Sequence, residues 1–170
     1  MALVPGLLAA LAVVQGHLAA GLILWLFNRL LDGLDGLAAR VHDKKSDLGG
    51  YLDLLLDFLV YLAVPIAFVV RAPTLAHFWA LIALLASYQL NTLSWTLLSA
   101  LLEKRRAGDA GRLTSVEMPA GLIEGAETVV FYTLFFLLPG YIPWLFSIMA
   151  VLVFFTAAQR VWWAWHALQR

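Results

Sequence analysis

The sequence predicts an all-α integral membrane protein, a bundle of about six transmembrane helices in which the first helix is short. Composition is the first observation: 63% of the 170 residues are hydrophobic and 13% are charged, whereas soluble domains carry about 45–50% apolar and about 25% charged residues. A mean hydropathy of +0.87 is the second. The third is that the apolar residues stand in long runs, and a helix needs about 20 such residues to span a bilayer.

The beginning of the chain predicts one short helix and one longer helix. The first 31 residues are apolar almost without a break, and Gln15-Gly16-His17 is a plausible hinge between Ala2–Val14 and a second segment from His17 to Val41. Thirteen residues rise by about 20 Å, less than the bilayer core of about 30 Å. We therefore expect a first helix that is truncated here, partly interfacial, or extended by residues absent from this chain.

The rest of the chain contains four stretches that are long and apolar enough to span a membrane. They are Leu52–Val70, Leu75–Leu102, Met118–Leu138 and Tyr141–Trp165. Basic residues gather in alternate loops, namely Arg40, Lys44, Lys45, Lys104, Arg105, Arg106 and Arg112. Because cytoplasmic loops carry the excess of Lys and Arg, these loops and both chain ends are expected in the cytoplasm. No repeat or polar appendage divides the chain, so we expect one domain over residues 1–170.

Charge and cysteine content exclude several classes of protein. Eleven Lys and Arg balance eleven Asp and Glu, which argues against a nucleic-acid binder that relies on positive charge. The chain has no cysteine, which excludes disulfides, cysteine-ligated metals and thiol catalysis.

Four carboxylates lie at or inside the predicted membrane segments: Asp32, Asp35, Asp53 and Asp57. A charge at mid-bilayer costs about 2.5–3.5 kcal/mol, so compensation is required. Arg40 is the nearest clear basic candidate, and bound cations are the simplest compensation. Oxygen ligands suit Mg²⁺ or Mn²⁺, and four carboxylates can hold two ions that also clamp phosphate oxygens.

The spacing brings these acids onto two helical faces. On one helix the shared face holds Asp32, Asp35, Gly36 and Ala39, and on the next it holds Gly49, Asp53 and Asp57. The small residues allow a ligand to approach the backbone closely, and Arg40 adds a fork suited to phosphate. Together these features suggest a diphosphate-containing substrate.

The pattern resembles the signature of the CDP-alcohol phosphotransferase family. Asp32-Gly-Leu-Asp35-Gly36-Leu-Ala-Ala39-Arg40, eight further residues and Gly49-Gly-Tyr-Leu-Asp53-Leu-Leu-Leu-Asp57 match D-x2-D-G-x2-A-R-x8-G-x3-D-x3-D at all fixed residues and spacings. The wider sequence resembles a bacterial branch of that family.

The resemblance implies a six-helix membrane enzyme, often a homodimer, in the bacterial inner membrane with its active site facing the cytoplasm. Such an enzyme moves a substituted phosphate, for bacterial members usually the phosphatidyl group of CDP-diacylglycerol, to an acceptor alcohol in phospholipid biosynthesis and releases CMP. The resemblance implies that Asp32, Asp35 and Asp53 bind metal, and that Asp57 contributes to the metal site and acts as the base. It also implies that Gly36, Ala39, Arg40 and Gly49 shape the CDP pocket.

Glu124, Glu127 and Arg112 are the candidates for an acceptor pocket. The two glutamates stand three residues apart on a predicted apolar helix and should point the same way. They would bind acceptor hydroxyl groups or, alternatively, link to a basic residue on another helix. Arg112 would bind an anionic acceptor or serve only the loop-charge asymmetry. The identity of the acceptor alcohol stays open.

Two other functions fit part of the pattern. An aspartate-rich intramembrane prenyltransferase would also use Mg²⁺ and a diphosphate, and Asp53-x3-Asp57 alone would suit it. A cation transporter would also use buried acids, although it would more often show broken helices in repeated halves. A non-catalytic relative of the family is a third alternative.

Overall fold

The computed structural model describes residues 2–41, 47–108 and 121–169, and within these ranges the side chains of residues 35–41, 47 and 105–108 are left undescribed. The described secondary structure is entirely helical, as the sequence predicts. The helices are α1 (Leu3–Val14), α2 (Leu18–Val41), α3 (Asp47–Arg71), α4 (Leu75–Gly108), α5 (Gly125–Leu137) and α6 (Ile142–Leu168), with a 3-10 turn, η1 (Pro139–Tyr141), before α6.

Three helical stretches in the described part of the chain are long and apolar enough to cross a membrane. They are Leu48–Arg71, Leu75–Lys104 and Pro139–Leu168. The apolar helices α1 and α5 are shorter, and the 24-residue α2 carries charged residues in its second half. The protein is therefore an integral membrane protein, and α3, α4 and α6 contain its three candidate spans among the described residues.

The hinge between α1 and α2 lies where the sequence predicts it. Gly16 has a φ of +85°, a conformation that costs a residue with a side chain about 1–2 kcal/mol. The Gly16 N–H donates to the Val13 carbonyl at 3.0 Å and the His17 N–H donates to the Ala12 carbonyl at 2.8 Å. This pair of bonds is the Schellman ending of a helix, so α1 stops after twelve residues and the chain reverses into α2.

The sequence predicts a helix over Met118–Leu138, and the beginning of that prediction is wrong. Residues 121–124 are not helical, residues 118–120 lie outside the described ranges, and α5 begins at Gly125. Glu124 is the N-cap of α5 in an extended conformation, and the Glu127 Oε2 accepts its N–H at 3.0 Å. Because Glu127 satisfies a backbone donor that has no partner inside the helix, the helix starts here.

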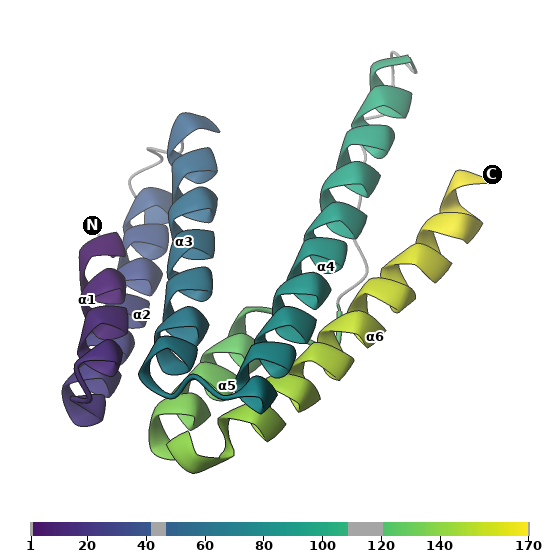
Figure 1. Ribbon diagram of the computed structural model, residues 1–170. Coiled ribbons are helices and arrows are strands. Elements are labelled where there is room, and N and C mark those ends of the chain that lie inside the picture. Colours follow the sequence, from purple (N-terminus) through teal and green to yellow (C-terminus); the bar gives the residue numbers. More distant parts are fainter. Residues whose placement is uncertain (1, 42–46, 109–120, 170) are drawn as a thin grey trace.

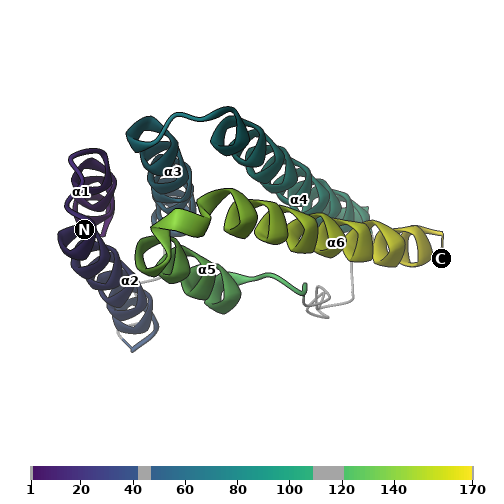
Figure 2. The ribbon, with the colours of Figure 1, turned by 60° about the horizontal axis from the view of Figure 1, so that its bottom comes forward.

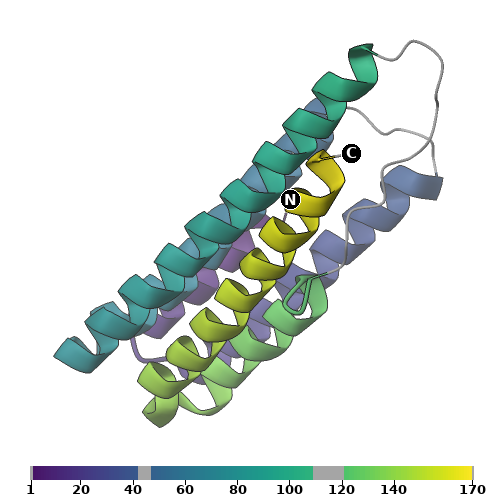
Figure 3. The same ribbon diagram turned by 90° about the vertical axis from the view of Figure 1, so that its right-hand side faces the viewer.

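The helices form two groups joined by α5 (Figure 1). Helix α1 packs against both α2 and α3, while α4 packs along α6. Helix α5 contacts α2 on one side and α6 on the other, and it lies between the two groups in the view of Figure 2. Figure 3 shows α4 and α6 running side by side.

Aromatic rings fill the junction between the two groups. The Trp25 ring of α2 stacks on the Tyr132 ring of α5 with centroids 5.0 Å apart, and Tyr61 of α3 meets Tyr132 edge-on at 5.3 Å. Phe135 of α5 and Phe146 of α6 meet at 4.8 Å. Trp25, Tyr132, Phe135 and Phe146 are fully buried. This cluster fixes α2, α3, α5 and α6 relative to one another, and these are the helices that carry most of the predicted site.

The ends of the helices agree with an alternating topology. In Figure 1 the C-terminal ends of α2, α4 and α6 lie at the upper end of the molecule, together with the beginning of α3. The turns after α1, α3 and α5 lie at the lower end. The ends of α2, α3 and α4 that border the two basic loops therefore share one end of the bundle.

Candidate active site

Arg29 of α2 joins the two halves of the acidic pattern. Its Nη2 donates to Asp57 Oδ1 at 2.7 Å and its Nη1 donates to Asp57 Oδ2 at 3.3 Å, a two-pronged contact with α3. The same Nη1 lies 3.6 Å from Asp32 Oδ2 on α2. The Arg29 side chain is only 9% exposed, against 25% for Asp32 and 23% for Asp57. Asp32 and Asp57 therefore lie on facing sides of α2 and α3, as the spacing predicts.

Neighbouring groups hold the guanidinium of Arg29 on its remaining sides. Nε donates to Asn28 Oδ1 at 2.7 Å, and Nη1 donates to the Tyr61 hydroxyl at 2.9 Å. The ring centroids of Trp25 and Tyr61 lie 5.0 and 5.1 Å from Cζ, within reach of a cation–π attraction. Asn28 is fully buried, and its amide donates to the Ala2 carbonyl at 2.7 Å. Contacts from α1, α2 and α3 thus fix this arginine in place.

Arg29 pairs with the aspartates, and sequence reasoning did not single it out. Arg40 is the cation that the sequence suggests as a partner for the aspartates, and its side chain lies outside the described part of the structure. Trp25, Arg29 and Asp32 stand at positions i, i+4 and i+7 of one helix. That spacing could have identified Arg29, since it places the arginine on the acidic face of the helix, three residues before the first aspartate.

The other residues of the pattern are described only in part. Asp53 and Gly49 are exposed on α3, one and two turns before Asp57. The side chains of Asp35, Gly36, Ala39 and Arg40 lie outside the description, although their backbone belongs to α2. Arg112 lies wholly outside the described ranges.

The chemical type of the available ligands suits a hard divalent cation. Asp32, Asp53 and Asp57 offer carboxylate oxygens, which Mg²⁺ and Mn²⁺ prefer. Arg29 pairs with Asp32 and Asp57 among the described side chains. Among the described side chains, no three potential ligands gather into one metal-binding group, and the predicted set also includes Asp35.

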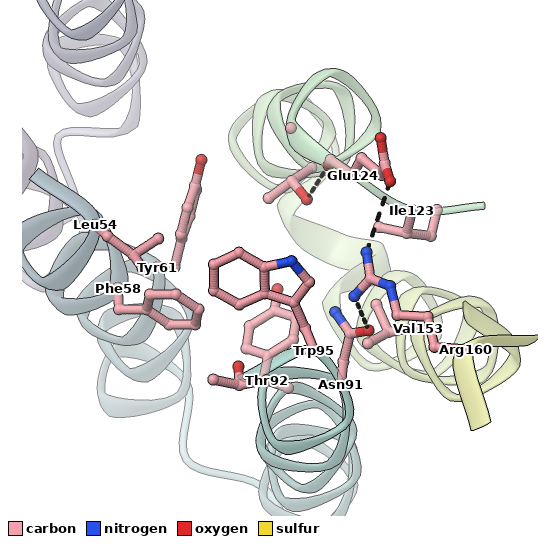
Figure 4. A pocket seen from close by; sticks show the side chains of 13 residues that line it. Leu54, Phe58, Tyr61, Asn91, Thr92, Trp95, Ile123, Glu124, Val153 and Arg160 are labelled. Carbon is pink, nitrogen blue, oxygen red and sulfur yellow. Dashed lines mark hydrogen bonds and ion pairs between the residues drawn. The ribbon is translucent and has the colours of Figure 1, made fainter. Parts of the chain in front are cut away.

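A cavity of about 290 Å³ adjoins the acidic cluster. Its wall on α3 is made by Leu54, Phe58 and Tyr61, and its opposite wall by residues of α4, α5 and α6 (Figure 4). Tyr61 belongs to both places, because its hydroxyl accepts from Arg29 while its ring lines the cavity. Trp95 of α4 lies between the α3 wall and the polar end of the cavity in Figure 4.

A polar chain of three side chains forms one end of the cavity. Arg160 Nη1 of α6 donates to Asn91 Oδ1 of α4 at 2.7 Å, and Arg160 Nη2 lies 3.6 Å from Glu124 Oε1 (Figure 4). Glu124 also accepts the Gly121 N–H at 2.6 Å. The alternative that Glu124 links to a basic residue on another helix is therefore correct, and Glu124 lines the cavity as well.

The two glutamates play different parts in the structure. Glu127 receives the Glu124 N–H and is not among the residues that line the cavity. The expectation that both glutamates point the same way from one helix is wrong, because Glu124 precedes the first turn of α5. The basic residue that pairs with Glu124 is Arg160, which also binds Asn91, and the sequence did not identify this partner. Arg160 stands out in the sequence as a charge near the end of a long apolar run.

Comparisons with known proteins match most of the chain. A family model described as CDP-alcohol phosphatidyltransferase matches residues 1–162. Over 161 residues the chain is 37% identical to the inner membrane protein YnjF of Escherichia coli strain K12, a match that covers 92% of this chain and 76% of that protein.

Two further relatives match over shorter regions. The chain is 43% identical over 82 residues to the phosphatidylcholine synthase of Pseudomonas aeruginosa, which covers 45% of this chain and 34% of that protein. It is 37% identical over 89 residues to the bifunctional IPC transferase and DIPP synthase of Thermococcus kodakarensis, which covers 51% of this chain and 20% of that protein. No solved structure matches the chain significantly.

Proposed function

Because the chain belongs to the CDP-alcohol phosphatidyltransferase family, whose members are transferases acting on a CDP-alcohol, we propose that it transfers a phosphatidyl group from CDP-diacylglycerol, or a similar CDP-alcohol, to an acceptor alcohol. CMP is the second product. The whole of residues 1–170 acts as one transmembrane domain in phospholipid biosynthesis. The active site faces the cytoplasm from a bacterial inner membrane, and two copies of the chain associate as a homodimer.

The contact of Arg29 with both Asp32 and Asp57 is the observation that carries this proposal. It brings the first and the last aspartate of the family signature together from two helices. Without that approach, the carboxylates would be isolated charges in an apolar bundle, each at a cost of about 2.5–3.5 kcal/mol.

The family generally depends on a divalent metal, and Asp32, Asp35, Asp53 and Asp57 are the residues that would hold two Mg²⁺ or Mn²⁺ ions here. When bound, such ions neutralise the diphosphate and stabilise the departing CMP. Gly36, Ala39 and Gly49 leave room for the CDP moiety, and Arg40 pairs with a phosphate.

Asp57 takes the proton from the acceptor hydroxyl as that oxygen attacks phosphorus. The new bond forms between the acceptor oxygen and the phosphatidyl phosphorus, and the bond from that phosphorus to the oxygen of CMP breaks. A carboxylate suits this role because an alcohol is a poor nucleophile until its proton is removed. Arg29 holds the Asp57 carboxylate by both oxygens, which fixes its direction before the substrate arrives.

The acceptor binds in the cavity beside Tyr61. Arg160, Asn91 and Glu124 supply donors and acceptors for its hydroxyl groups at the polar end. Glu127 contributes by fixing the backbone of Glu124. Arg112 binds the acceptor if the acceptor is an anion.

CMP release tests the proposed function directly. Purified protein in lipid nanodiscs is supplied with CDP-diacylglycerol, Mg²⁺ or Mn²⁺, and one alcohol at a time from a panel that includes glycerol phosphate, serine and inositol phosphate. We expect metal-dependent CMP release with at least one acceptor. Transfer from a prenyl diphosphate without CMP release would support the prenyltransferase, and ion flux without CMP release would support the transporter. Either result would contradict the proposal.

A further inference from the structure

Arg29 is paired with two of the carboxylates that the proposed metal ions would need as ligands. It contacts both oxygens of Asp57 and one oxygen of Asp32. A guanidinium has five N–H donors and cannot lose its charge in a protein. A divalent cation that approaches Asp32 or Asp57 therefore meets a permanent positive charge already in contact with those oxygens.

The surroundings of Arg29 show that its position is built into the fold. Asn28 holds Nε, Tyr61 accepts from Nη1, and the Trp25 ring lies 5.0 Å from Cζ. The side chain is 9% exposed, so water screens its charge only weakly. These contacts hold the arginine where it faces Asp32 and Asp57, the proposed metal ligands.

We propose that Arg29 is a resident counter-cation, a positioning residue that competes with the divalent ion for Asp32 and Asp57. With the metal absent, Arg29 neutralises the two carboxylates and keeps them on facing sides of α2 and α3. When a cation binds, it has to share or displace the contacts of Arg29 with Asp57, so the arginine weakens the resting affinity of the site for metal. This inference rests on the proposed function in taking Asp32 and Asp57 as metal ligands.

Titration with Mn²⁺ alone, followed by the electron paramagnetic resonance signal of the free ion, tests the inference without any substrate. The proteins are the wild type and the Arg29→Gln, Arg29→Lys and Arg71→Gln variants, each purified in nanodiscs. In Arg29→Gln the dissociation constant for Mn²⁺ should fall by at least about tenfold, because a repelling charge next to the ion is removed. Mere damage to the site would weaken Mn²⁺ binding instead.

The other two variants separate charge from position. Arg29→Lys keeps the positive charge, so its affinity for Mn²⁺ should stay within about threefold of the wild type. Arg71→Gln removes a positive charge from the far end of the same helix as Asp57, about 21 Å along its axis. Its affinity for Mn²⁺ should not change.

A double variant covers the case in which Arg29→Gln fails to fold. Loss of one partner of a buried ion pair is far more destabilising than replacement of both. The Arg29→Gln/Asp57→Asn protein is therefore compared with Asp57→Asn, and it should bind Mn²⁺ more tightly than Asp57→Asn does.

The outcomes distinguish this inference from the proposed function. Unchanged or weaker Mn²⁺ binding on loss of Arg29, in a wild type that does bind the ion, would overturn the role of Arg29 alone. A wild type that binds no Mn²⁺ would overturn the metal site and the inference with it.

Discussion

Arg29, Asp57 and Tyr61 form the point where the acidic cluster meets the cavity. Asp57 and Tyr61 stand one turn apart on α3, and both receive N–H groups of Arg29. The proposed base is therefore held against α2 while the tyrosine beside it lines the cavity. An acceptor bound in the cavity would approach the carboxylate past the Tyr61 side chain.

Asp57→Asn tests the proposed base. The amide cannot take a proton from the acceptor, so transfer should fall by about 10²–10⁴-fold, while CDP binding remains measurable. CMP release and equilibrium binding of CDP check the two parts separately. Glu103→Gln, which removes a carboxylate from an exposed position near the end of α4, should leave both unchanged. Turnover near the wild-type rate in Asp57→Asn would refute the assignment.

Arg160→Gln tests the acceptor side of the cavity. The substitution removes the contacts with Asn91 and Glu124 and should raise the KM for the acceptor about tenfold, equivalent to about 1.4 kcal/mol. The KM for the CDP-alcohol should stay the same, because the proposed place for that substrate is the acidic motif. Steady-state kinetics with each substrate varied in turn measures both. The neighbouring variant Gln159→Ala, at an exposed position of α6 outside the cavity, is the matched control.

At the scale of elements, α1 packs closely against α3 and so supports the helices that carry the aspartates. A Cβ at Gly6 of α1 would lie 2.5 Å from Val60 Cγ2 and 3.1 Å from the Asn28 amide nitrogen. The missing side chain therefore lets α1 approach both helices that carry the aspartates. Small residues serve this purpose between helices in membranes, where van der Waals contact replaces the hydrophobic effect.

Gly6→Ala should destabilise the protein by about 1–3 kcal/mol, because the new methyl group overlaps the Val60 side chain. Thermal unfolding in detergent measures the change. The double variant Gly6→Ala/Val60→Ala should be more stable than the sum of the two single effects predicts. Gly33→Ala, where an added Cβ meets nothing within 4 Å, should instead be neutral or gain up to about 1 kcal/mol. Equal effects at both glycines would contradict the packing argument.

At the scale of the whole molecule, the acidic cluster and the cavity adjoin each other along α3, because Asp57 contacts Arg29 while Tyr61, one turn later, contacts Arg29 and lines the cavity. Helix α1 packs against α3, and the cavity lies between α3 and the helices α4, α5 and α6. A donor bound at the acidic motif and an acceptor bound in the cavity would meet at the face of α3 that carries Asp57.

The topology of the chain can be tested with single cysteines, because the protein has none of its own. Ala72→Cys lies in the turn between α3 and α4, and Gln169→Cys lies after α6. In intact cells a membrane-impermeant maleimide should label the Ala72→Cys variant, and it should label the Gln169→Cys variant only after the membrane is opened. The reverse pattern would place the basic loops outside and contradict the proposed cytoplasmic site.

Much of the architecture could be predicted from local features of the sequence. Long apolar runs gave the helical membrane class, and Gly16 gave the hinge, since only a residue without a side chain reaches its φ of +85° at little cost. The family signature gave the aspartates. The beginning of α5 was not predictable from hydropathy, because the N–H of Glu124 is satisfied by the side chain of Glu127, which stands in an otherwise apolar run.

The sequence by itself therefore determined the membrane class, the hinge and the identity of the acidic residues, all of which depend on composition and on spacing along one helix. Only the tertiary structure decided that Arg29 bridges Asp32 and Asp57, and that Arg160 links Asn91 with Glu124 at the end of a cavity. These contacts join residues up to 69 positions apart in the chain. They depend on how each helix is rotated and packed against its neighbours, which local periodicity does not specify.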